Sequence, residues 1–171
     1  MSELAGSSTT PTPAAAGGVQ AEAVSGTTGQ STHKVRVLLY SDDASVREQV
    51  KRSVGRKPAR DVEVVDWTEC ATPVIAEKHV KAGGLDLLIL DGESVPLGGM
   101  GLCRQLKCEV YDCPPVIVLT GRPQDAWLAA WSLADRAVPQ PIDPLVMANA
   151  VADVARESKT GSIPAGAEVA R

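Results

Sequence analysis

The sequence predicts an α/β fold: a (βα)5 doubly wound parallel sheet with helices on both faces. Short apolar runs alternate with segments of helical periodicity between residues 34 and 156. Residues 85–90 form an almost uninterrupted apolar run, which is typical of a central parallel strand buried on both faces. Glycines and prolines separate the runs, as expected where strands and helices alternate.

Each strand is expected at one of the short apolar runs. In chain order, the runs are residues 35–40, 62–67, 85–90, 116–119 and 137–138. The proline pair Pro114-Pro115 directly precedes the fourth run and marks a break before that strand. The fifth run is short, so we expect the fifth strand to be short as well.

Each helix is expected where apolar residues recur every three or four positions after a strand. The first helix carries Val46, Val50 and Val54 and stops at Gly55. The next three are expected at residues 73–84, 100–108 and 123–134. The fifth has Asp143 as its N-cap and Pro144 as its first residue. Its predicted inner face consists of Leu145, Ala148, Ala152 and Ala155.

The two ends of the chain differ in composition from the centre. Residues 1–33 consist mostly of Ala, Gly, Ser, Thr and Pro, and residues 157–171 repeat this bias. Such segments bury too little apolar surface to offset the loss of chain entropy. The sequence therefore predicts a disordered arm at 1–33, one domain at 34–156 and a disordered tail at 157–171.

Composition excludes several classes of function. The net charge is −4 and the pI is about 5.2, which argues against a nucleic-acid partner. The apolar runs are far shorter than the roughly 20 residues of a membrane helix, so we expect no membrane insertion and a cytoplasmic location. The four cysteines lack the spacing of a zinc site and are expected to be free thiols.

Polar residues follow the strands in an ordered way. They are Ser41-Asp42-Asp43 after the first strand, Asp91 after the third, Thr120 after the fourth and Gln140-Pro141 after the fifth. Open α/β sheets bind ligands beyond the carboxyl ends of their strands. These residues are therefore the candidate site.

The motifs YSDDASVRE, DLLILDGE and VIVLTGR resemble the receiver domain of response regulators, over residues 34–156. The resemblance implies a flavodoxin-like sheet with strand order 2-1-3-4-5. It implies that Asp91 is the phosphoacceptor and that Thr120 and Gln140 contact the phosphoryl group. It also implies a Mg²⁺ ion held by Asp42, Asp91 and the backbone carbonyl of Glu93.

Three departures from the family pattern predict a degenerate switch. Gln140 stands where the family has a lysine, and an amide cannot neutralise a phosphoryl charge. Ser41 stands where the family has the first of two acids. Ala137 stands where the family has the aromatic residue that reports phosphorylation.

One alternative register keeps both acids. Sliding the alignment pairs Asp42 and Asp43 with the two acidic positions, but it displaces Arg47 from its family position. The family's lysine-proline bond is cis, and the Gln140-Pro141 bond is expected to keep that geometry.

Trp127 and Trp131 lie four residues apart on the fourth expected helix and share a face. If Leu128 and Leu133 point inward, the tryptophans are exposed and form a partner interface. If the helix is rotated, they pack into the core instead. The family commonly uses this region for partners, which favours the interface.

The resemblance implies a stand-alone response regulator that is not an enzyme and acts through protein contacts, with a sensor kinase as the phosphoryl source. The alternative is a non-phosphorylated accessory subunit of a larger complex, which could bring the chain to a membrane. The sequence motifs of the core resemble those of actinobacterial orphan receivers, some of which are linked to respiratory complex I. An enzyme is the weakest alternative, because no Gly-rich phosphate loop or nucleophile with a histidine base is found.

Overall fold

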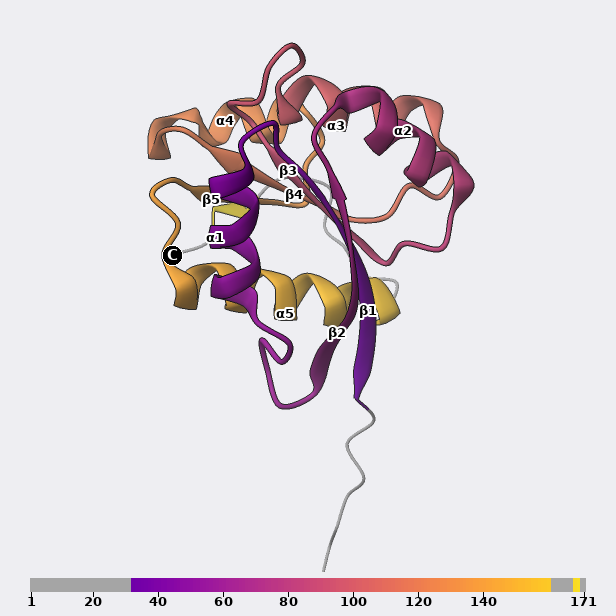
Figure 1. Cartoon of the computed structure of the whole chain (residues 1–171), viewed down its shortest axis with the longest axis vertical. Coiled ribbons are helices and arrows are strands. Elements are labelled where there is room, and N and C mark those ends of the chain that lie inside the picture. The colour runs from indigo at the N-terminus through magenta and orange to yellow at the C-terminus, as the bar shows by residue number, and fades with distance from the viewer. Residues whose placement is uncertain (1–31, 161–167, 170–171) are drawn as a thin grey trace, which may run out of the picture.

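A computed structural model describes residues 32–160 and 168–169 of the chain. It contains one parallel sheet in the order β2-β1-β3-β4-β5-β6 (Figure 1). The strands are β1 (His33–Tyr40), β2 (Val62–Cys70), β3 (Leu87–Asp91), β4 (Val116–Thr120), β5 (Arg136–Pro139) and β6 (Glu168–Val169). The predicted strand order 2-1-3-4-5 is confirmed, with β6 added at the β5 edge.

Five α-helices and one 3₁₀ turn are described beside the sheet. They are α1 (Ala44–Val54), α2 (Pro73–Ala82), α3 (Gly99–Glu109), η1 (Pro123–Asp125), α4 (Ala126–Trp131) and α5 (Pro144–Thr160). Asp43 caps α1 by accepting a hydrogen bond from the Ser45 amide, and Asp143 caps α5 through the Leu145 amide, as predicted for α5. None of the described helices is long and apolar enough to cross a membrane.

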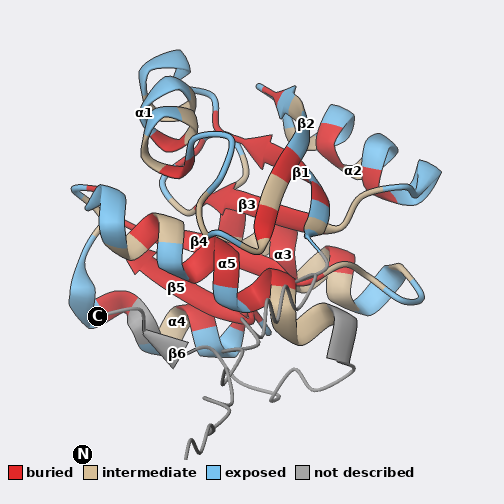
Figure 2. Cartoon of the chain, turned by 90° about the horizontal axis from the view of Figure 1, so that it is seen from below, coloured by how far each residue is buried: buried red, intermediate tan, exposed pale blue. Residues whose placement is uncertain are grey.

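The sheet has a core layer on each face, because alternate side chains of a strand point to opposite faces. Helices α1 and α5 cover one face, where Val37 and Ile89 pack with Val50 of α1 and Met147 of α5. Helices α2, α3 and α4 cover the other face. Figure 2 shows buried strands between helices whose outer sides are exposed. The four cysteines are free thiols, as predicted.

Two predictions about helices are wrong. The fourth helix was expected at 123–134, but it begins as η1 and its α-helical part ends at Trp131. Leu145 was expected on the inner face of the last helix, yet it is 70% exposed. Leu145 lies in the first turn of α5, where Met147 is the residue that enters the core, and Met147, Val151 and Val154 provide the buried stripe.

The first and last long elements of the described chain lie at the ends of the expected domain. Strand β1 begins at His33, and residues 1–31 of the expected arm lie outside the described residues. Helix α5 extends to Thr160, four residues beyond the expected boundary at 156. Within the expected tail, Glu168 and Val169 pair with β5, and the remaining positions after 160 lie outside the described residues.

Candidate functional site

The candidate site lies at the carboxyl ends of four neighbouring strands. Asp91 ends β3 and Thr120 ends β4, while Ser41 and Gln140 directly follow β1 and β5. The backbone amide of Gln140 donates to the Thr120 carbonyl oxygen at 2.8 Å, which extends the pairing of β5 with β4. The predicted ordering of polar residues along the strand ends therefore produces one site.

Asp91 is only 3% exposed, and both of its carboxylate oxygens accept hydrogen bonds. Ser41 Oγ donates to Asp91 Oδ2 at 2.8 Å. Gln140 Nε2 and the backbone amide of Glu93 each donate to Asp91 Oδ1 at 3.1 Å. All three donors are neutral, so hydrogen bonds rather than an opposite charge stabilise this buried carboxylate.

Ser41 is held in place from both sides. Arg47 Nη1 donates to the Ser41 carbonyl oxygen at 2.6 Å, and the Asp43 amide donates to Ser41 Oγ at 3.2 Å. Asp43 uses its own carboxylate to cap α1. These contacts agree with the alignment without gaps, because Ser41 is the residue of this loop that reaches Asp91.

The loop between β3 and α3 is tied to the end of β1. Tyr40 is buried and donates from its hydroxyl to the Leu97 carbonyl oxygen at 2.6 Å. Burial is the main cause that raises the pKa of Tyr40 above its usual value. The Asp42 amide donates to Oγ of the buried Ser94 at 3.3 Å. These bonds fix the wall of the site beside Asp91.

Few acidic side chains gather at the expected Mg²⁺ site. Asp42 is exposed, and the Glu93 side chain, which is not the expected ligand, lies at the end of β4, where a Cβ added to Gly121 would stand 2.6 Å from Glu93 Oε1. No group of three or more His, Cys, Asp or Glu side chains in residues 32–160 and 168–169 is placed to hold a metal ion. A metal bound by Asp91 Oδ2 would share this oxygen with the hydroxyl of Ser41.

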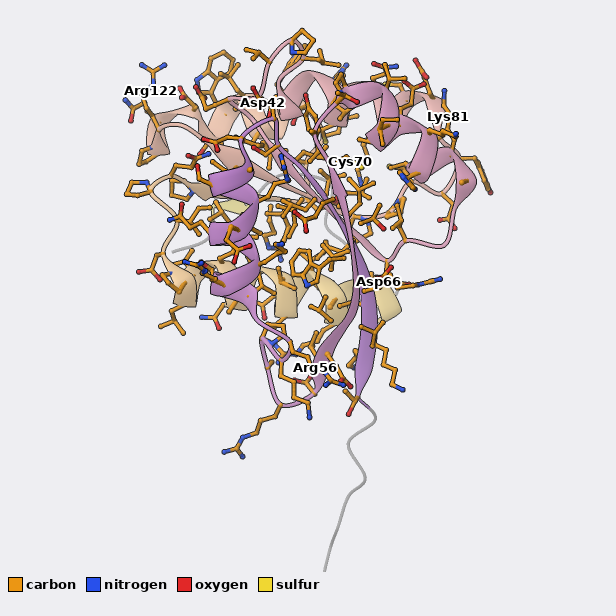
Figure 3. The ribbon with its side chains drawn as sticks, in the orientation of Figure 1. Asp42, Arg56, Asp66, Cys70, Lys81 and Arg122 are labelled. Carbon is orange, nitrogen blue, oxygen red and sulfur yellow. The ribbon has the colours of Figure 1, made fainter. Side chains whose placement is uncertain are left out.

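The structure also shows the surroundings of the other residues near the strand ends. Thr120 is buried at the end of β4, and Ala137 is buried within β5. The Gln140-Pro141 peptide bond is cis, as expected, and the Val95-Pro96 bond is also cis. Arg122 lies at the outer rim (Figure 3) and pairs with Asp125 at 3.1 Å, so its charge is directed to that carboxylate.

Trp127 and Trp131 are 66% and 56% exposed, which settles the open question of the helix rotation. The expectation that Leu133 points inward is wrong, because Leu133 is exposed and Ala129 and Ala134 take the buried positions. Sequence reasoning did not identify Arg104 of α3, whose guanidinium lies over the Trp131 ring. No local signal could connect these two residues, because 27 positions separate them.

Sequence comparison identifies response regulators as relatives. An uncharacterized response regulatory protein of Mycobacterium tuberculosis is 46% identical over 126 residues, which cover 74% of this chain and 95% of that protein. The response regulator MprA of Mycobacterium bovis is 34% identical over 89 residues, which cover 52% of this chain and 35% of MprA. No family model matches the chain.

Solved structures show the same fold. The receiver domain of Francisella response regulator 1452 aligns with a TM-score of 0.60 and 18% identity, covering 75% of this chain and 99% of that one. The receiver domain of NarL from Mycobacterium tuberculosis aligns with a TM-score of 0.58 and 23% identity, covering 72% and 98%.

Proposed function

Because the chain belongs to the response-regulator family and folds as a receiver domain, we propose that it is an atypical receiver that acts through protein contacts. Asp91 is the candidate phosphoacceptor, and Thr120 and Gln140 are the candidate contacts of the phosphoryl group. The observation that carries this proposal is the hydrogen bonding of Asp91. Neutral donors, chiefly Ser41 and Gln140, donate to its two carboxylate oxygens.

The chemistry of the site supports slow phosphorylation. One oxygen of Asp91 would attack phosphorus as the leaving group of the donor departs, and the hydrogen bonds from Ser41 and Gln140 make this oxygen a weaker nucleophile. The phosphoryl charge would then face the uncharged amide of Gln140. The Glu93 carboxylate at Gly121 adds negative charge nearby. A sensor kinase is the partner expected to provide the phosphoryl group.

The same geometry bears on the Mg²⁺ site and on the partner contacts of this receiver. Any Mg²⁺ site at Asp42, Asp91 and the Glu93 carbonyl is proposed to be weak, because the neutral hydroxyl of Ser41, and not a second carboxylate, lies beside Asp91. Output is proposed to leave through Trp127 and Trp131, since tryptophan is enriched at the energetic centres of interfaces. The chain is proposed to act in the cytoplasm.

The direct test is an amide-resolved NMR titration with Mg²⁺ and beryllofluoride, repeated on Asp91→Ala. The expected result is a set of shifts confined to the surroundings of Asp91 and absent from the variant. Shifts that spread to the indole signals of Trp127 and Trp131 and require Asp91 would instead demonstrate an intact switch, and the degenerate receiver would be rejected.

A second candidate function is a non-phosphorylated accessory subunit of a larger complex, which could place the chain at a membrane through its partner. The buried, hydrogen-bonded carboxylate of Asp91 and the exposed side chains of Trp127 and Trp131 favour this second function. Respiratory complex I is the complex suggested by the sequence resemblance. If this candidate is right, beryllofluoride causes no NMR shifts. The native chain also co-migrates with a large complex, and Trp127→Ala and Trp131→Ala abolish this co-migration.

A further inference from the structure

The exposed Trp131 of α4 contacts Arg104 of α3. Arg104 Nη1 donates to the Trp131 carbonyl oxygen at 2.6 Å, and the Arg104 guanidinium carbon lies 5.0 Å from the centroid of the Trp131 ring. This combination of hydrogen bond and cation–π contact restricts both side chains. The surface is thus ordered before a partner arrives, which reduces the entropy lost on binding.

Leu133 extends this surface at a conformational cost. Its φ is 65°, a left-handed conformation that glycine usually supplies at the end of a helix. The Leu133 amide donates to the Ala130 carbonyl oxygen, which ends α4. The leucine side chain is nevertheless 46% exposed. Strained residues that expose an apolar side chain are candidates for a functional role.

The charges around this surface favour a negatively charged partner. Two neighbouring carboxylates are turned inward and paired: Asp125 with Arg122, and Asp135 with Lys107. Arg104 has no carboxylate partner within the described part of the chain. Its guanidinium therefore presents positive charge beside the Trp131 ring, one helical turn from Trp127.

The other flank of α4 is already occupied. Strand β6 pairs with β5 and lies against α4, so the chain itself covers part of the flank that faces β5. On the flank that faces α3, Arg104 stacks on Trp131, whose side chain stays exposed.

The geometry points to the aromatic patch, defined as Arg104, Trp127, Trp131 and Leu133, as a docking site for an acidic, aliphatic segment of a partner protein. Aliphatic side chains of that segment pack on the indole rings and Leu133, and a carboxylate pairs with Arg104. This inference rests on the proposed action through protein contacts and names the chemistry of the partner.

The test is a selection of binders from a library of random short peptides on the immobilised full chain, without Mg²⁺ or beryllofluoride. Selected peptides are expected to be enriched in Asp or Glu next to Leu, Ile or Val. Trp127→Ala and Trp131→Ala are each expected to weaken their binding about tenfold or more. Leu133→Gly, which relieves the backbone conformation, is expected to weaken binding while the fold is kept.

A charge reversal gives the matched control. Arg104→Glu is expected to shift the selection toward Lys and Arg, whereas Arg52→Glu, an exposed change on α1, is expected to leave it unchanged. The inference is overturned if no peptide depends on the two tryptophans, or if acidic residues are not enriched.

Two further results would replace the proposed partner. A concentration-dependent dimer that Trp131→Ala abolishes would assign the patch to a second copy. Tryptophan-dependent binding to vesicles containing phosphatidylglycerol would assign it to a membrane surface. Since none of these measurements uses the Asp91 site, they are independent of whether the phosphorylation switch works.

Discussion

Ser41 Oγ donates a 2.8 Å hydrogen bond to Asp91 Oδ2, which links the end of β1 to the end of β3. A hydroxyl therefore contacts the carboxylate at the position where the sequence resemblance leads us to expect an acid. An acid at this position would repel Asp91 unless a cation lay between them. With serine there, a hydrogen bond joins the two strand ends without a cation.

Removing the Ser41 hydroxyl should destabilise the fold. Ser41→Ala leaves one oxygen of the buried Asp91 carboxylate without its donor, and hydrogen bonds to charged groups contribute about 2 kcal/mol. We expect a loss of this size in the free energy of unfolding, measured with urea at pH 7. Ser53→Ala, which removes an exposed hydroxyl on α1, is the control and should change stability by less than about 0.5 kcal/mol. Equal effects of the two substitutions would contradict the role given to Ser41.

Restoring the family residues should create a dependence on Mg²⁺. Ser41→Asp combined with Gln140→Lys places a second carboxylate and a cation around Asp91. We expect millimolar Mg²⁺ to raise the Tm of this variant but to leave that of the natural chain nearly unchanged, because ligands stabilise only the state that binds them. Ser53→Asp controls for a carboxylate added elsewhere. A similar Mg²⁺-induced rise in the natural chain would show that Ser41 and Gln140 do not weaken the metal site.

The sequence was sufficient to place the strands but not to define α4. Apolar runs identify the five main strands, since a central parallel strand is apolar on both faces. The end of α4 depends on the left-handed backbone of Leu133, and a leucine is not a signal for that conformation. The exposure of Leu145 was also missed, because helical periodicity does not reveal where a helix first meets the sheet.

The candidate site was predictable in its residues but not in its bonds. Residues that follow neighbouring parallel strands meet at one edge, so Asp91 and Gln140 could be brought together from sequence. The donation from Ser41 to Asp91 requires the hydroxyl orientation, which the fold determines. The contact of Arg104 with Trp131 depends on the packing of α3 beside α4.

Acid should weaken the fold partly through Asp61. Arg156 donates to both oxygens of this carboxylate, at 2.7 and 2.8 Å, and lowers the pKa of Asp61 from 3.8 to about 2. Stability from this pair is fully present above pH 4 and is lost as the pH falls toward 2. The urea midpoints of the natural chain and Asp61→Asn should therefore converge over this range. Asp153→Asn, at another carboxylate that pairs with Arg156, is the comparison. A constant gap between the natural chain and Asp61→Asn would contradict the assignment.

Leu133 should reverse the usual ranking of alanine and glycine. At most helix positions glycine is less stable than alanine by about 1 kcal/mol, because it loses more backbone entropy on folding. At φ 65° the alanine Cβ meets the following carbonyl, at a cost of about 1 to 2 kcal/mol. Leu133→Gly is therefore expected to be more stable than Leu133→Ala, although both lose the same leucine contacts. Ala148→Gly in α5 should show the ordinary sign, a loss of about 1 kcal/mol relative to the natural chain. Urea unfolding of the three variants measures this, and a lower stability for Leu133→Gly than for Leu133→Ala would show that position 133 carries no left-handed strain.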